Sequence, residues 1–311
     1  MPSTVLVTGG AGFIGSHLVP QLIERGDRVR ILDNMSRGDR DRIAGWAATG
    51  RVELVEQDVR YGGAVHQAMA GCDAVVHLAA VSINKSEADP FESVDVNVVG
   101  SNNVFKAAAD HGVGRVVFAS SASVYGDPET LPMREDGALR PLTPYCIAKV
   151  TGEHLLDYYA RRSGLTWIAL RFFNVYGPGQ KPTAYYTSVI NHFVKRLQAG
   201  EPPIIDGGGE QSMDFVHVHD IARAVVMALD VAPARANVPI NVGTGIDTSV
   251  AELARTLIAA VGVDVEPQFR PRDVLVSRRM ADITRARDVL GWQPTIDVRT
   301  GMQDLVDHDV S

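Results

Sequence analysis

Six short apolar runs alternate with stretches of helical character through the first 172 residues of this 311-residue chain. The runs are rich in β-branched and aromatic residues and read TVLVTG, RVRILD, VELVEQD, AVVHLAA, RVVFASS and TWIALRF. Parallel strands need a crossover between them, because the chain must return over the sheet before it adds the next strand. The alternation therefore predicts an α/β fold in which helices cover both faces of a doubly wound parallel sheet.

The texture of the sequence changes at Asn174. The segment VYGPGQKPTAYY is rich in glycine, proline and aromatic residues, and the amphipathic run SVINHFVKRLQAG follows it. Two later runs, DFVHV and VPINVG, have strand character and are expected to return to the main sheet. We therefore expect a sheet domain at 1–173 with returning segments near 214–244, and a smaller mixed α/β substrate-binding region at 174–213 and 245–311.

Three glycines stand at the turn between the first predicted strand and the first predicted helix. In VLVTGGAGFIGSHL they are Gly9, Gly12 and Gly15, with Phe13 and Ile14 between the last two. Without side chains, the backbone can turn tightly and approach a pyrophosphate, whose charge then lies at the positive N-terminus of a helix. Because this GxxGxxG spacing directly follows a strand, it predicts a Rossmann-type dinucleotide-binding domain.

The ends of the next two predicted strands carry acids. Asp33, followed by Asn34, ends the second strand. A carboxylate there accepts hydrogen bonds from ribose hydroxyls and repels a 2′-phosphate, which favours NAD over NADP. Arg37 keeps NADP as the less favoured alternative. Asp58 and Val59 end the third strand, where the adenine ring would lie.

Composition narrows the choice of partners. Hydrophobic residues make up 45% of the chain and charged residues 22%, which is typical of a globular protein. A net charge of -7 argues against nucleic acid or an anionic membrane as the partner. No run approaches the ~18 apolar residues of a membrane helix and no basic leader opens the chain, so we expect a cytoplasmic protein. The two cysteines have no metal-binding or disulfide spacing, and no metal is expected.

The stretch TPYCIAK predicts the start of a helix that carries two residues able to do acid–base chemistry together. Thr143 is a good N-cap, and Pro144 suits the first helical position. Tyr145 and Lys149 then lie on one helix face, so the ammonium is expected to lower the pKa of the phenol and favour a base near neutral pH. A tyrosine and a lysine at this spacing also occur on ordinary solvated helices, so the pair alone is weak support for catalysis.

Several motifs together resemble one enzyme family. TGGAGFIG, the DN at 33–34, the DV at 58–59, HLAA, SSASVYG and YCIAK resemble the extended short-chain dehydrogenase/reductase family. RFFNVYGPGQ and the sequence to about residue 295 resemble its NAD-dependent UDP-sugar 4-epimerases. The resemblance covers nearly the whole chain. It implies tightly bound NAD, a UDP-sugar substrate and a homodimer.

The resemblance also implies roles at the reacting centre. Tyr145 matches the catalytic base, and Lys149 matches the lysine that lowers its pKa and binds the nicotinamide ribose. Ser121 matches the residue that hydrogen-bonds the reacting sugar hydroxyl, and Ser123 can assist it. Asn97 matches an asparagine near the site. Further cofactor contacts are implied in HLAA for Leu78, Ala79 and Ala80.

The implied reaction inverts C4 of the sugar. Tyr145 takes the O4 proton, directly or through Ser121, while C4 gives hydride to NAD; the 4-keto sugar turns and accepts the hydride on its other face. Dehydratases of this fold carry acids just after the serine or threonine, and UDP-glucuronate decarboxylases carry a glutamate there. This chain has Ala122 and Ser123 instead, which favours epimerisation. Dehydration, decarboxylation and 4-reduction stay open as alternatives.

On the substrate side, the match is incomplete. Asn174 matches the pyrophosphate-binding asparagine of the epimerases, and Arg270 and Asp273 match their uridine-diphosphate contacts. Met213 stands where the family usually has a phosphate-binding arginine, which leaves more charge to Arg270 and Arg272.

Two further positions bear on which sugar fits. Ser277 matches a position that limits the C2 substituent, and its small side chain suggests room for an N-acetyl group. Lys181 stands where UDP-glucuronate 4-epimerases have an arginine for the sugar carboxylate, so UDP-glucuronate and UDP-glucose are both candidate substrates; a solvent-exposed lysine is the alternative. His217 and His219 could suggest a metal, but a strand followed by a helix that Asp220 caps is the simpler interpretation.

Overall fold

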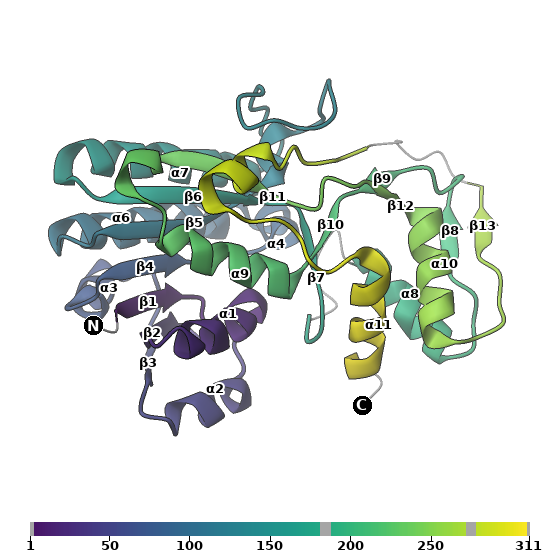
Figure 1. The fold of residues 1–311 in the computed structure, drawn as a ribbon, viewed down its shortest axis with the longest axis horizontal. Coiled ribbons are helices and arrows are strands. Elements are labelled where there is room, and N and C mark those ends of the chain that lie inside the picture. Colours follow the sequence, from purple (N-terminus) through teal and green to yellow (C-terminus); the bar gives the residue numbers. More distant parts are fainter. Residues whose placement is uncertain (1–2, 181–187, 272–277, 310–311) are drawn as a thin grey trace.

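The computed structural model of the chain describes residues 3–180, 188–271 and 278–309. Its centre is a parallel sheet of seven strands, and the predicted α/β class is confirmed (Figure 1). In spatial order the strands are β11 (Val238–Val242), β6 (Thr166–Phe172), β5 (Arg115–Ser121), β4 (Ala74–His77), β1 (Thr4–Thr8), β2 (Arg28–Asp33) and β3 (Val52–Glu56). The order changes direction between β1 and β4, which is where Rossmann-type sheets bind their ligands.

Helices cover both faces of this sheet, because its central strands β1, β4, β5 and β6 are buried along nearly their whole length. The core of one face includes residues of α1 (Phe13–Glu24), α2 (Arg40–Ala47) and α9 (Val218–Leu229). The core of the other face includes α3 (Gly62–Met69), α6 (Ser101–Asp110) and α7 (Pro144–Ser163). The helix α7 packs tightly on β5: a Cβ at Gly152 would lie 2.6 Å from the ring of Phe118.

Short segments connect these elements. After β4 come α4 (Ile83–Ala88), α5 (Pro90–Ser93) and the π-helix η1 (Val94–Gly100). A 3-10 turn, η2 (Ala122–Tyr125), follows β5, and η3 (Pro233–Arg235) precedes β11. The π-helix η4 (Ala286–Leu290) lies between β13 (Gln268–Arg270) and α11 (Val298–Asp309) along the chain.

A smaller mixed α/β region lies at one end of the sheet (Figure 1). It contains three two-stranded pairs: β7 (Asn174–Tyr176) with β10 (Phe215–His217), β8 (Ile204–Asp206) with β13 (Gln268–Arg270), and β9 (Ser212–Met213) with β12 (Thr248–Ser249). Its helices are α8 (Ser188–Gln198), α10 (Val250–Val261) and α11 (Val298–Asp309). Tyr176, Phe193, Leu253 and Leu305 are among the buried residues of its separate core.

Two details differ from the sequence-based expectations. DFVHV does not join the main sheet: β10 pairs with β7, whereas VPINVG forms the edge strand β11 as expected. Asp220 does not cap α9. The N-cap is His217, whose ring accepts from the amide of His219, whereas Asp220 accepts from the amides of Thr295 and Ile296. A buried carboxylate in the first turn of a helix can accept hydrogen bonds from the backbone of a distant loop, and sequence spacing does not reveal this.

No helix in residues 3–180, 188–271 or 278–309 combines the length and apolar character needed to cross a membrane. The division of the chain into a cofactor domain and a substrate region stays a prediction.

Candidate active site

A cavity of about 650 Å³ opens at the carboxyl ends of the central strands. Its wall brings together fifteen of the predicted residues, which come from the carboxyl ends of five strands, the loops that follow them and the first turns of α1 and α7. They are Gly9, Gly12, Phe13, Ile14, Gly15, Asp33, Asn34, Asp58, Val59, Leu78, Ala79, Ala80, Ser121, Tyr145 and Lys149.

The glycine loop leaves no room for side chains at two points. Gly9 has a φ of +70°, and a Cβ there would lie 2.7 Å from the amide nitrogen of Ala79. A Cβ at Gly15 would lie 2.4 Å from the carbonyl oxygen of Gly10. The N-cap of α1 is Gly12, and no side chain caps this helix. The first amides of α1 are thus not covered by a capping side chain, an arrangement suited to a pyrophosphate.

Two carboxylates stand at the ends of β2 and β3. Asp33 accepts hydrogen bonds from the amides of Ala11 at 3.0 Å and Met35 at 2.9 Å, which fix it against the glycine loop. Burial raises the pKa of this carboxyl. For Asp58, burial also opposes the charge, but hydrogen bonds from Arg60 and Asn34 outweigh it and lower the pKa to about 2.

The predicted reacting groups do meet. The Nζ of Lys149 lies 5.3 Å from the ring centre of Tyr145 and donates a 2.7 Å hydrogen bond to the carbonyl of Ala119 at the end of β5. The hydroxyl of Ser123 donates to that of Ser121 at 2.9 Å, and Ser121 hydrogen-bonds with Tyr145. The helix that carries the pair begins as predicted, with Thr143 as N-cap accepting from the amide of Cys146 and Pro144 next.

The expected low pKa of Tyr145 is not found. Burial raises the pKa of the phenol to about 12, although the hydrogen bond with Ser121 opposes this. Burial also lowers the pKa of Lys149 to about 7, although Glu153 opposes this. Sequence spacing placed the cation correctly but gave no measure of the desolvation that both groups share. A positive charge bound beside Tyr145 would favour the phenolate.

Several predicted residues lie behind or away from the cavity wall. Asn97 is buried in η1, where its side chain accepts from the amide of Val81 and donates to its carbonyl, so it holds the loop after β4. Ser123 is buried behind Ser121. Asn174 donates to the carbonyl of Asp214 at 3.1 Å.

On the far side, Arg270 forms an ion pair with Asp206 at 2.6 Å, and its side chain is 60% exposed. Lys181, Asp273 and Ser277 lie outside the described residues, as does Arg272. Among the described residues, no three His, Cys, Asp or Glu side chains are grouped to hold a metal ion.

Three residues that sequence reasoning missed support this site. Arg60 pairs with Asp58 through two hydrogen bonds, at 3.0 and 2.9 Å. Ser120 lines the cavity and donates to the buried carboxylate of Glu153. The spacing of one helical turn between Lys149 and Glu153 could have pointed to Glu153. Its partners Ser120 and Arg171 lie on β5 and β6, however, and the spacing along the helix does not reveal them.

Known proteins resemble this chain in sequence and in structure. The model that describes the NAD dependent epimerase/dehydratase family matches residues 5–243. The chain belongs to this family. NAD is accordingly the cofactor, and its pyrophosphate and ribose suit the uncapped helix and the carboxylate of Asp33.

Relatives in the NAD dependent epimerase/dehydratase family match along the full length. UDP-glucose 4-epimerase of Mycolicibacterium smegmatis is 38% identical over 311 residues, covering 97% of each chain. UDP-glucose 4-epimerase of Thermotoga maritima, solved with UDP-glucose, superimposes with a TM-score of 0.89 at 33% identity, covering 99% of this chain and 98% of that one. A variant of UDP-glucuronic acid 4-epimerase from Bacillus cereus gives 0.88 at 26% identity, covering 98% of each.

Proposed function

We propose that this protein inverts C4 of a UDP-sugar through a transient 4-keto intermediate. The observation that carries the proposal is the cluster of Ser121, Tyr145 and Lys149 in the wall of the cavity formed by the glycine loop. The names of the relatives support the same reaction class.

Each residue has a distinct task in the proposed reaction. Ser121 receives a hydrogen bond from Ser123, so its own proton is directed away from Ser123 and it can pass a proton between the sugar O4 and Tyr145. Lys149, fixed by the carbonyl of Ala119, supplies the cation beside the phenol. NAD, when bound, supplies the hydride acceptor and donor. Glycine-loop amides and Asp33 would hold it in place.

The sugar is proposed to be of the UDP-glucuronate or UDP-glucose type. Relatives named for each of these sugars match the chain in structure. Lys181 supports a carboxylate-bearing sugar by its place in the sequence alone.

Epimerisation is preferred to dehydration or decarboxylation for a chemical reason. Elimination of water needs an extra acid and base beside the reacting carbon. The residues after Ser121 are Ala122 and Ser123, both buried and neither a carboxylate.

The test is a panel of UDP- and dTDP-sugars incubated with the purified protein without added NAD, with C4 inversion read by NMR. Inversion of at least one UDP-sugar with no net change in NADH is expected. Products that lack a C6 hydroxyl or carboxylate would replace the proposal with dehydration or decarboxylation, and a requirement for stoichiometric NADH would replace it with 4-reduction.

We also propose that two copies pair through one helical face. Exposed apolar side chains gather on elements that contact one another, α5, η1 and α7: Phe91 is 86% exposed, and Val94, Ile147 and Tyr158 are also exposed. An exposed apolar patch of this kind marks a protein interface. Sedimentation of wild type should give a dimer and Phe91→Asp a monomer; a wild-type monomer would contradict the proposal. Cytoplasmic location stays a prediction.

A further inference from the structure

A buried carboxylate lies one helical turn beyond the catalytic lysine. Glu153 is 8% exposed and sits on α7, four residues after Lys149. Its Oε1 accepts from the hydroxyl of Ser120 at 2.6 Å and from Nε of Arg171 at 3.0 Å. Its Oε2 accepts from Nη2 of Arg171 at 2.7 Å. The carboxylate is therefore held at both oxygens by β5 and β6, the two strands beneath the helix.

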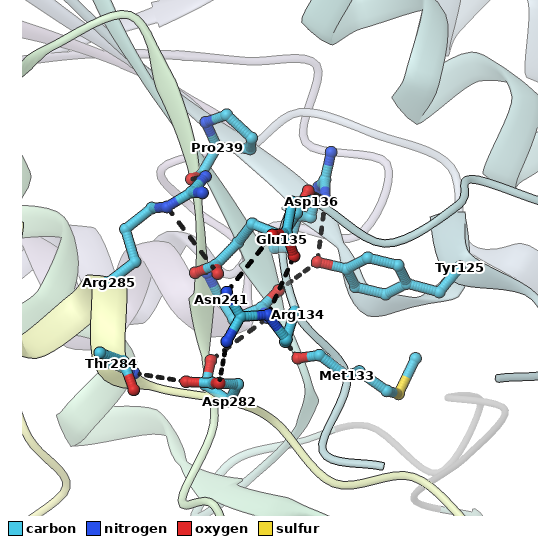
Figure 2. Close-up of polar contacts among 11 residues, drawn as sticks. Tyr125, Met133, Arg134, Glu135, Asp136, Pro239, Asn241, Asp282, Thr284 and Arg285 are labelled. Carbon is cyan, nitrogen blue, oxygen red and sulfur yellow. Dashed lines mark hydrogen bonds and ion pairs between the residues drawn. The ribbon is translucent and has the colours of Figure 1, made fainter. Parts of the chain in front are cut away.

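The same network continues away from the catalytic groups. Nη1 of Arg171 donates to the hydroxyl of Tyr125 at 2.9 Å, and that hydroxyl donates to Oδ1 of Asn241 at 2.6 Å. Figure 2 shows the far end, where Glu135 accepts from the amide of Asn241 and lies near Arg285. Helix α7, strands β5, β6 and β11, and the turn η2 are thus tied through one buried polar chain.

Lys149 needs such support because its charge is buried. Lys149 is 4% exposed, and its ammonium donates to one carbonyl, that of Ala119. The titratable groups around it are Tyr145 and Glu153 on its own helix and His77 at the end of β4, with Arg171 on β6 behind Glu153. Glu153 is the acid among them, and its charge favours the ammonium, whereas burial opposes it.

We propose that Glu153 is a positioning residue that, held by Ser120 and Arg171, fixes α7 on the sheet and keeps Lys149 a cation beside Tyr145. This proposal rests on the proposed function for its consequence in catalysis. The predicted effect of Glu153 on the protonation of Lys149 can be measured without any substrate.

The chain has five lysines, so the pH titration of each ε-carbon can be followed by NMR of protein labelled with ¹³C-lysine. Lys149→Met assigns the resonance. In the protein as purified, Lys149 should titrate below the usual range of a lysine, because its ammonium is buried. In Glu153→Gln it should titrate lower by about one pH unit, because the nearest anion is gone. Glu153→Asp, which keeps the charge, should restore most of the shift.

Tyr125→Phe is the matched control. It removes two hydrogen bonds from the same buried network but leaves the carboxylate beside Lys149 in place. It should lower the melting temperature without moving the Lys149 titration. Equal titrations in wild type and Glu153→Gln would overturn the proposal, as would a shift in Tyr125→Phe as large as that in Glu153→Gln.

If Glu153→Gln does not fold, the double variant Glu153→Gln with Arg171→Met carries the test, because it removes both buried charges together. Lys149 should again titrate below its wild-type value, and an unchanged value would overturn the proposal. The titration stands apart from the proposed function: a shift in a protein that epimerises no UDP-sugar would sink that function and keep the role of Glu153. In an active enzyme, the alkaline limb of the kcat profile should move down with the same shift.

Discussion

The cofactor cavity and the smaller region are built in different ways. Each predicted residue of the cavity follows a strand of one parallel sheet or opens a helix beside it, so a local motif fixes both its place and its neighbours. In the smaller region, two positions compared with nucleotide contacts come from separate strand pairs: Arg270, predicted to contact the nucleotide, and Met213, which stands where an arginine was expected. Arg270 lies on β13 and faces Asp206 on β8, whereas Met213 lies on β9 beside β12.

This difference teaches where sequence motifs carry functional information. Parallel strands deliver their carboxyl ends to one edge, so a short motif after each strand is enough to build a shared site. Separate two-stranded pairs do not share an edge where their strands end together. The role of a single residue there depends on which segments pack beside it.

The largest expected effect comes from a substitution at Tyr145 in the cavity. Tyr145→Phe removes the proposed proton acceptor and little volume, so kcat should fall by about 10²–10⁴-fold. Bound NAD and the affinity for UDP-sugar should change little. Turnover, the NAD content of denatured protein and the binding of UDP-sugar measure the three. Near-normal turnover would remove Tyr145 from the reaction.

The second prediction concerns the close approach of the backbone in the glycine loop. Gly15→Ala places a methyl group 2.4 Å from the carbonyl oxygen of Gly10, so the loop must move, at a cost of about 1–3 kcal/mol. The purified variant should carry little NAD. Gly45→Ala in α2 is the control, since its new Cβ would point into open space and contact no other part of the chain. If both variants retain NAD equally, the tight loop is not what shapes the cofactor site.

The third prediction compares a histidine of the main sheet with one of the smaller region. The ring nitrogens of His77 contact the hydroxyls of Thr8 at 2.6 Å and Ser101 at 2.9 Å, and burial lowers its pKa to about 3. Because the unfolded chain binds this proton near pH ~6.5, stability is full above that pH and is lost as the pH falls towards 3. About 2 kcal/mol should be lost between pH 6.5 and 5.

Denaturant unfolding at the two pH values checks this, with His77→Gln as the comparison that lacks this loss. Burial also lowers the pKa of His217, but Asp304 at 3.2 Å opposes the shift, so His217→Gln should remove a smaller pH dependence. A larger effect from His217 would reverse the comparison between the two regions.

The smallest expected effect comes from a substitution at Lys181, in the predicted substrate-binding region. Lys181→Ala should weaken turnover of UDP-glucuronate about tenfold, because a carboxylate would lose its charged partner, while UDP-glucose should be unaffected. The kcat/KM for both sugars measures the selectivity. Equal losses on the two sugars would assign Lys181 no role in recognising a carboxylate.

Much of the fold was predictable because it follows from local rules. The six apolar runs became β1 to β6, and Thr143 and Pro144 began α7 as expected. Errors arose where a distant segment decided the outcome. Asp220 accepts hydrogen bonds from the amides of Thr295 and Ile296 and does not cap its own helix, and β10 pairs with β7 outside the main sheet.

The amino-acid sequence by itself determined the strand ends, the glycine positions and the placing of Tyr145 and Lys149 on one helix face. These depend on periodicity and spacing, which a chain carries locally. Only the tertiary structure decided the protonation of Tyr145 and Lys149. That property depends on burial and on partners such as Glu153 and Arg171, which are 18 residues apart, and Tyr125 and Asn241, which are 116 apart. Packing brings such groups out of water and into contact, and no local pattern records it.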